Sequence, residues 1–311
     1  MAGVATQYPH GFANGVSILG QPILTVQTGN VWWVSSLLGN DGNKGNYNQP
    51  FGTWGRATSF CQAGDIIVLM AGHAETISSA TALALSVAGV ITYGIGLGSN
   101  RPTITMDTAT STTIAVSAAG VGVSNVRFVA GIAGIVSAFT LTTAKGFTLD
   151  GCSFSKTSTF TFLSIVTTDT TSNHADSMVI TGNDWRDTAT TVSPFVSMAG
   201  TNEYCVFSNN YLNLGVQNDV TAGVNVAAGK VLTNFVATGN LISKLDTSNT
   251  TGILFGTNQS TNSGILDNNR WVGLVAGTPL FAPATTGLGY GVNYATGVAD
   301  KSGFILPAQD S

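Results

Sequence analysis

A short pattern of apolar and polar positions recurs along the chain. Each copy has an apolar residue, a variable residue, Gly or Asn, a position that is often Asn, a variable residue and a large apolar residue. The six copies start at Val123, Leu149, Ile180, Phe207, Ala237 and Leu266. Successive copies start 26, 31, 27, 30 and 29 residues apart. A near-constant period of this length is typical of a solenoid with one structural unit per repeat.

Each copy predicts the same local structure. The leading apolar residue ends a strand, and Gly or Asn then forms a tight corner that other residues enter only at a cost. The last apolar residue starts the next strand facing inward, which predicts a core stack of Phe128, Phe154, Trp185, Leu212, Ile242 and Trp271. Four consecutive copies share an Asn whose stacked amides predict a hydrogen-bonded ladder. Its members are Asn183, Asn210, Asn240 and Asn269.

The repeat therefore predicts an all-β fold, a single-stranded parallel β-helix over residues 65–276. That length gives roughly seven rungs, stacked about 4.8 Å apart. The segments between copies are rich in Thr and Ser and predict surface loops. A leucine-rich or other solenoid is the competing interpretation, and the chain lacks the helical periodicity and the Leu framework that it needs.

The two ends of the chain depart from the repeat. Residues 1–28 carry no Lys, Arg, Asp or Glu, and their apolar side chains predict an arm that lies on another surface. Residues 29–64 predict a strand, a Gly/Asn-rich loop and a short helix over 50–62 that covers the open end of the coil. Residues 277–311 lose the motif but keep large apolar side chains, which predicts a C-terminal cap or second arm.

Composition narrows the function. Only 8% of the residues are charged, and the 11 Lys and Arg residues are scattered singly in a chain of net charge −4, so we expect no nucleic-acid partner. The uncharged run over residues 76–100 alternates locally and is broken by Ser, Thr, Asn and Gly, so we expect strands and no membrane span. The cysteines are Cys61, Cys152 and Cys205, which have no CxxC spacing and predict buried free thiols.

Candidate chemical groups are few. The acidic candidates are Asp169, Asp176, Asp184 and Asp187, with His174 and Arg186 nearby, and we interpret them as solvated turn residues. His73 and Glu75 lack the Cys pair of a zinc deaminase, and residues 41–46 fail the spacing of a calcium loop. Lys145 and Lys156 stand apart from any carboxylate cluster. We therefore expect no catalytic site, no cofactor and no metal.

The opening of the chain resembles a known family. The segments GNVWWVSSLLGNDGNKG (29–45), QPFGTW (49–54) and AGDIIVLMAGHAETI (63–77) resemble the start of β-helix virion proteins of tailed bacteriophages. The resemblance implies a non-enzymatic structural virion protein, a capsid decoration or cement protein on the outer capsid surface. Its implied partners are the major capsid protein and itself, most simply as a homotrimer.

The N-terminal arm is the part that we expect to dock on the capsid shell. Its large apolar residues are Tyr8, Phe12, Val16, Ile18, Leu19, Ile23 and Leu24. The same family also contains tailspikes, so the alternative is a tailspike or fibre module that binds, and even cleaves, a host surface glycan.

Overall fold

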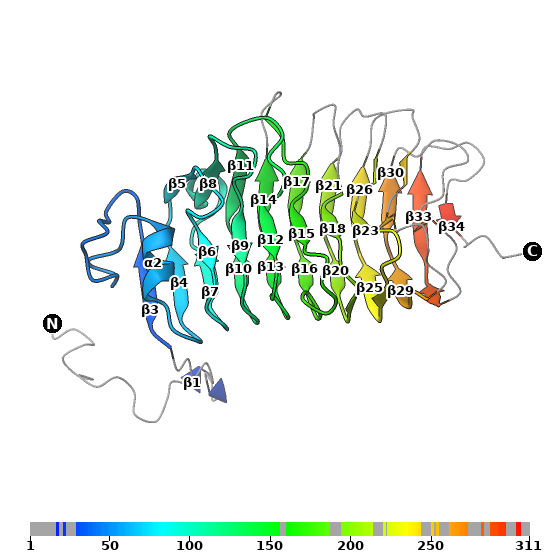
Figure 1. Ribbon diagram of the computed structural model, residues 1–311, viewed down its shortest axis with the longest axis horizontal. Helices are drawn as coiled ribbons and strands as arrows, with labels where there is room; N and C mark the ends of the chain where they lie inside the picture. Colours follow the sequence, from blue (N-terminus) through cyan, green and yellow to red (C-terminus); the bar gives the residue numbers. More distant parts are fainter. Residues whose placement is uncertain are drawn as a thin grey trace, which may run out of the picture.

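The chain winds as a parallel β-helix, which confirms the predicted all-β solenoid. The structure, a computed structural model, describes residues 17–18, 21–22, 29–155, 160–186, 194–213, 220–221, 223–243, 250–251, 253–254, 261–272, 281–282, 287–296 and 303–305. Figure 1 shows an elongated coil whose rungs follow one another in chain order. No described helix is long and apolar enough to cross a membrane.

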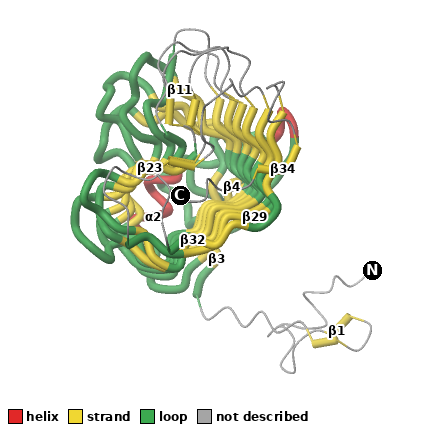
Figure 2. Tube along the Cα trace, turned by 90° about the vertical axis from the view of Figure 1, so that its right-hand side faces the viewer, coloured by secondary structure: helices red, strands yellow, loops and turns green. Residues whose placement is uncertain are grey.

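Three sheets run along the coil and surround its core (Figure 2). The first sheet contains β3 (Val31–Val34), β4 (Ile66–Leu69), β7 (Ile91–Gly94), β10 (Gly122–Ser124), β13 (Thr148–Asp150), β16 (Val179–Thr181), β20 (Val206–Ser208), β25 (Phe235–Thr238), β29 (Gly264–Asp267) and β32 (Leu288–Tyr290). The second sheet contains β5 (Ala74–Ile77), β8 (Thr103–Met106), β11 (Arg127–Ala130), β14 (Ser153–Ser155), β17 (Asp184–Arg186), β21 (Tyr211–Asn213), β26 (Leu241–Ser243), β30 (Arg270–Val272), β33 (Asn293–Thr296) and β34 (Gly303–Ile305).

The third sheet is shorter. It contains β6 (Ala84–Leu85), β9 (Ile114–Val116), β12 (Phe139–Leu141), β15 (Val166–Thr168), β18 (Val196–Met198), β23 (Val224–Val226), β28 (Ile253–Leu254) and β31 (Phe281–Ala282). Three small pairs are β1 (Ser17–Ile18) with β2 (Gln21–Pro22), β19 (Asn202–Glu203) with β24 (Leu232–Thr233), and β22 (Val220–Thr221) with β27 (Thr250–Thr251). The described helices are α2 (Trp54–Phe60) and the 3-10 turn η1 (Gly98–Asn100).

The repeat sets the register between turns. Leu149 of β13 pairs with Ile180 of β16, and Phe154 of β14 pairs with Trp185 of β17, so equivalent motif positions lie above one another. Between the first and second sheets the chain turns at the third motif position. The residues there all have positive φ, between 52° and 68°: Asn125, Gly151, Gly182, Asn209, Gly239 and Asn268. Gly and Asn tolerate this conformation best, which explains why the motif is restricted to them.

The predicted core stack is confirmed for five of its members. Phe128, Phe154, Trp185, Leu212 and Ile242 are at most 1% exposed. The rings of Phe128 and Phe154 stack with centroids 5.2 Å apart, and Phe195 from the third-sheet side packs edge-on against Trp185. Trp271 keeps the register opposite Ile242, but its side chain lies outside the described part of the chain.

The predicted Asn ladder is also present and is one member longer. Each amide nitrogen donates to the side-chain oxygen of the next Asn along the coil, from Asn183 through Asn210, Asn240 and Asn269 to Asn293. Each amide nitrogen also donates to a backbone carbonyl, and each side-chain oxygen accepts a backbone N–H of the preceding turn. These side chains are buried, so this complete pairing is what makes their burial tolerable.

The coil is longer than the predicted 65–276 at both ends. β3 already pairs in parallel with β4, and β31, β32 and β33 extend the three sheets beyond residue 276. The tail thus contributes strands, and its last described strand, β34, pairs antiparallel with β33. The docking residues proposed for the arm, Tyr8, Phe12, Val16, Ile18, Leu19, Ile23 and Leu24, lie outside the residues whose side chains the structure describes.

The predicted helix is shorter than 50–62 because Thr53 caps it. The Thr53 hydroxyl accepts the backbone N–H of Arg56, so the helix begins at Trp54 and runs to Phe60. Trp54 and Ala57 are fully buried, and α2 contacts β3, β4 and β6 at the N-terminal end of the coil. Asp41, considered for calcium, instead accepts the backbone N–H groups of Gly52 and Thr53 just before the helix.

Candidate functional site

The outer face of the second sheet carries the charged candidates. In each strand the middle residue points into the core and its neighbours point out, as in Ser153–Phe154–Ser155. Register then forms an outward column in which Arg127 lies beside Ser153, and Ser153 beside Asp184. Tyr211 continues this column on β21. Side chains from separate repeats are therefore brought together on one face.

A hollow of about 460 Å³ opens over β11, β14 and β17. It is lined by Gly98, Ser99, Arg101, Arg127, Ser153, Ser155, Asp184 and Arg186. The η1 turn supplies one side of the hollow, and the outward residues of the three strands supply its floor. Three guanidinium groups thus face a single carboxylate, which gives the hollow a net positive charge.

The carboxylate does not neutralise all three cations. Arg186 Nε lies 3.2 Å from Asp184 Oδ2, a pair whose Arg side chain is 69% exposed and which contributes little to stability. Within the described residues, the guanidinium groups of Arg101 and Arg127 form no hydrogen bond or ion pair with the protein. Their donors are therefore available to a ligand.

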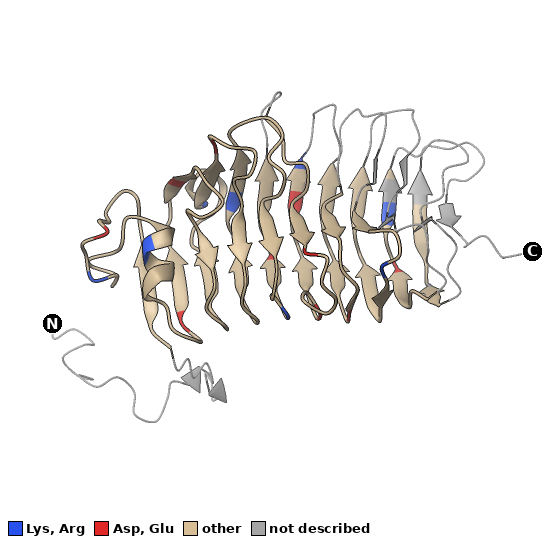
Figure 3. Cartoon of the chain, in the orientation of Figure 1, with Lys and Arg blue, Asp and Glu red and all other residues tan. Residues whose placement is uncertain are grey.

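This cluster corrects the expectation that the basic residues are scattered singly. Three of the 11 Lys and Arg residues line one hollow, although Arg101, Arg127 and Arg186 are far apart in the sequence. Figure 3 shows how sparse charge is elsewhere and how blue and red segments occur on β11 and β17. Asp184 and Arg186 were among the candidates, whereas Arg101 and Arg127 were missed.

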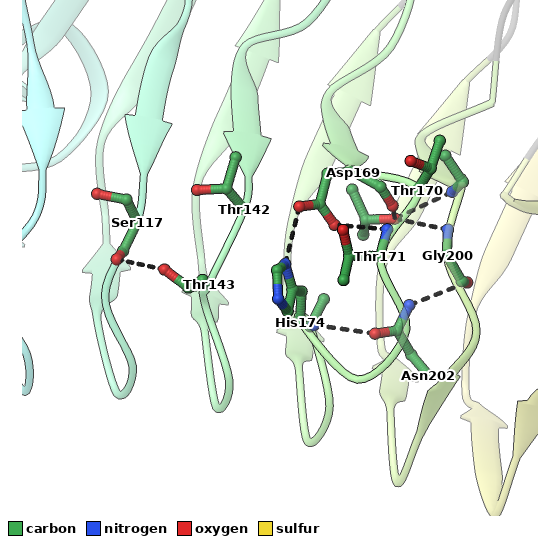
Figure 4. Close-up of polar contacts among 12 residues, drawn as sticks. Ser117, Thr142, Thr143, Asp169, Thr170, Thr171, His174, Gly200 and Asn202 are labelled. Carbon is green, nitrogen blue, oxygen red and sulfur yellow. Dashed lines mark hydrogen bonds and ion pairs between the residues drawn. The ribbon is translucent and has the colours of Figure 1, made fainter.

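The other acidic candidates lie elsewhere on the coil. Asp169 and His174 belong to the long turn between β15 and β16, where Asp169 Oδ2 lies 2.8 Å from His174 Nδ1 (Figure 4). Asp169 Oδ1 also accepts the backbone N–H of Thr171, so this carboxylate orders its own turn. A carboxylate that orients an imidazole is an arrangement used in proton transfer. The Asp169–His174 pair lies in the turn that leaves the third-sheet strand β15, and it does not line the hollow on the second sheet.

Asp176 has a structural role in the same turn. Its Oδ2 lies 3.0 Å from Lys145 Nζ and its Oδ1 accepts the backbone N–H of Glu203, which joins three successive turns. Lys145 is therefore paired with one carboxylate, and no metal-binding group of carboxylates surrounds it among the described residues. Asp187 and Lys156 lie outside the described residues.

His73 and Glu75 also hold the fold together. The buried His73 Nδ1 accepts the backbone N–H of Ser36, and its Nε2 lies 3.2 Å from Glu75 Oε2. The same Glu75 oxygen accepts the backbone N–H of Trp54, so the pair fastens α2 to the first turns of the coil. Among the described residues no group of His, Cys, Asp and Glu is arranged to hold a metal ion.

The comparisons with known proteins concern fold alone. No family model and no curated protein matches the chain. Among solved structures, a rhamnogalacturonan lyase matches with 12% identity over 89% of this chain and 90% of the other, with a TM-score of 0.47. A pectate lyase matches with 12% identity over 86% and 80% and a TM-score of 0.44. A GH136 lacto-N-biosidase from Eubacterium ramulus matches with 11% identity over 86% and 67% and a TM-score of 0.43.

These neighbours correct one expectation. We expected a non-enzymatic scaffold, yet the solved structures that share the β-helix are named as lyases and a biosidase. The expectation that the protein is not an enzyme is therefore withdrawn. At this identity the likeness shows the fold and does not identify a reaction.

Proposed function

We propose that this protein binds a glycan in the hollow on the outer face of the second sheet. The observation that carries the proposal is the lining of that hollow, where arginine donors, serine hydroxyls and one carboxylate converge. Sugar hydroxyls both donate and accept hydrogen bonds. Arg127 offers donors, Asp184 offers acceptors, and Ser153 between them offers both.

The floor of this site is rigid. β11, β14 and β17 are each paired on both sides, so their backbones are held in one register before any ligand arrives. A preformed surface loses little conformational entropy on binding. Tyr211 extends the same outward column beyond Asp184, and its half-buried ring offers a flat surface for a sugar ring.

A glycan bound in the hollow could also be cleaved there, and the experiment described below tests both binding and cleavage. Hydrolysis by two carboxylates needs a second carboxyl group about 5–10 Å from the first. Of the residues that line the hollow, Asp184 alone carries a carboxylate. An active protein would therefore use a mechanism that depends on the arginines, or a group beyond the lining described above.

The test is a polysaccharide panel, measured by calorimetry for binding and by product chromatography for cleavage. We expect at least one polysaccharide to bind, and Arg127→Ala to weaken it about tenfold, the loss typical of one charged hydrogen bond. Arg56→Ala is the matched control, since Arg56 is an exposed arginine on α2 and does not line the hollow. The proposal fails if no polysaccharide binds, or if both variants bind as the wild type does.

Capsid decoration stays a prediction. It rests on the opening residues and on an arm whose side chains lie outside the described part of the chain. The same holds for the homotrimer, the major capsid protein as partner and the virion as location. Fractionating virions would test it by locating the chain on the shell or on the tail.

A further inference from the structure

We infer that the glycan is a polyanion, with carboxylate or sulfate groups on more than one residue, and that it runs along the coil axis across the strands. This inference rests on the proposed function and adds the charge of the ligand and its direction. Three observations support it: the charge balance of the hollow, the spacing of its arginines and the residues between them.

The charge balance of the hollow is opposite in sign to that of the whole chain. The chain has a net charge of −4, yet the hollow holds three arginines and one aspartate. Because Asp184 pairs with Arg186, the guanidinium groups of Arg101 and Arg127 are left without a counter-charge from the described residues. A cleft lined by one sign of charge attracts ligands of the opposite sign.

The spacing of the arginines indicates several anionic groups. Arg127 lies on β11 and Arg186 on β17, with β14 between them. Two strand spacings place their backbones about 10 Å apart along the coil. Only the Nε of Arg186 contacts Asp184, so within the described residues its two terminal nitrogens remain available to a ligand. One carboxylate is too small to bridge the distance between Arg127 and Arg186, whereas two acidic groups of one glycan can each meet an arginine. The ligand then extends from strand to strand, parallel to the coil axis.

The residues between the two arginines suit a sugar chain. Ser153 and Ser155 face outward from β14, so an uncharged hydroxyl surface separates the cationic positions. Every basic residue in the lining is Arg, whose planar fork binds carboxylate or sulfate through two parallel hydrogen bonds. A nucleic acid is disfavoured, because the hollow offers three cations on an acidic protein and no broad basic surface.

Three dextrans with one backbone test the charge: neutral dextran, carboxymethyl dextran and dextran sulfate. We expect one or both charged forms to bind at least about tenfold more tightly than the neutral form, and the affinity to fall as salt is raised. Binding of the carboxymethyl form alone identifies a carboxylate ligand, and binding of the sulfate form alone identifies a sulfate ligand.

Substitutions of the arginines test whether the hollow causes the preference for charged dextrans. Arg127→Ala and Arg186→Ala should each remove most of it, and Arg127→Lys should restore only part, because the charge returns without the fork. Arg56→Ala, on α2 and outside the hollow, should leave this preference unchanged. Short oligomers should bind more weakly than long ones, since a single residue cannot reach both arginines.

Several outcomes would overturn the inference. Tight binding of neutral polysaccharides with no preference for charged forms would leave the proposed function intact and refute the polyanion. A preference for charged dextrans that persists in both alanine variants would refute the hollow as its cause. Tighter binding of duplex DNA than of either charged dextran would favour a nucleic-acid ligand. The absence of binding to every glycan, neutral or charged, would refute both proposals.

Discussion

Asp65 shows how much one buried carboxylate can do at the start of the coil. Its Oδ1 accepts the backbone N–H of Asn30, while its Oδ2 accepts the Trp32 indole N–H and the backbone N–H of Gln62. Burial acts to raise the pKa of Asp65, but the hydrogen bonds from Gln62, Trp32 and Asn30 outweigh it, so this pKa lies below its usual value. The ionised form is therefore the one that the fold prefers.

Asp65→Asn should lower the free energy of unfolding at pH 7 by about 1–3 kcal/mol, the cost of disturbing buried hydrogen bonds. The folded pKa is below the unfolded one, so this stabilisation is complete above about pH 4 and is lost as the pH falls through the folded pKa. Urea denaturation at pH 7 and at successively lower pH should show the two proteins converging. Glu203→Gln is the control, and a difference that is independent of pH would contradict the explanation.

A second prediction at the scale of the residue concerns the reactivity of the cysteine thiols. Burial raises the pKa of the Cys152 and Cys205 thiols to about 12, and burial together with the charge of Asp65 does the same for the half-buried Cys61. The thiolate is the reactive form, so native protein at pH 8 should not react with iodoacetamide at Cys152 or Cys205. Mass spectrometry should find all three labelled in urea. Rapid labelling of the native protein at either buried site would show that the coil opens there.

At the scale of the element, the corner between the first and second sheets is the unit that repeats. It combines a positive-φ residue, a ladder Asn and an inward aromatic or aliphatic residue, as in Gly182, Asn183 and Trp185. The ladder ends at Cys152, whose backbone N–H is the last donor to an Asn side chain. The side-chain and backbone N–H groups of each ladder Asn from Asn183 to Asn269 are therefore paired with the side-chain oxygen of the next Asn. The ladder joins the turns of this half of the coil.

Asn210→Ala should destabilise the fold by about 1–3 kcal/mol, because it leaves the amide of Asn183 and the N–H of Asn183 without their acceptor. Thermal unfolding followed by circular dichroism measures the loss. Asn225→Ala is the matched control, since Asn225 points outward from the third-sheet strand β23. Equal losses in the two variants would mean that the ladder contributes nothing beyond an ordinary polar side chain.

The sequence predicts the corners well because each carries its own conformational signal. It fails at the ends for a physical reason: around Asn293 the corner has Val292 in place of Gly or Asn and Ala295 in place of a large apolar residue. In the hollow, Arg127, Ser153 and Asp184 occupy the same motif position. The repeat alone could therefore predict that they lie side by side on one face. Arg101 follows the η1 turn, outside any repeat, and no local signal marks it.

At the scale of the whole molecule, the coil is one continuous core that is covered at its N-terminal end. α2 lies over the first turns with Trp54 and Ala57 fully buried, and the His73–Glu75 pair fastens it there. Beneath α2, the buried apolar side chains of the described residues form one cluster from Val34 to Leu288, and no polar layer divides the described coil into two domains. A substitution that weakens the packing of α2 should therefore destabilise the turns of the coil beneath it.

Trp54→Ala should lower the free energy of unfolding by about 3–5 kcal/mol, the usual cost of removing a buried aromatic side chain. Chemical denaturation of the full chain measures it. Leu38→Ala, at a leucine that is 73% exposed, should have an effect within about 0.5 kcal/mol. A small loss for the tryptophan variant would mean that α2 is dispensable for the coil.

The antiparallel strand β34 has a consequence for self-association. A coil of parallel rungs offers its last strand as a template on which another molecule can continue the sheet, end to end, into a fibre. β34 occupies that edge of β33 and runs in the opposite direction, so the second sheet cannot be extended in register from this end. A protein that ends at Thr296 would expose this edge of β33 and should therefore dimerise through it as its concentration rises, which light scattering measures. Because α2 covers the opposite end of the coil, growth should stop at pairs, and a chain that retains β34 should dimerise less.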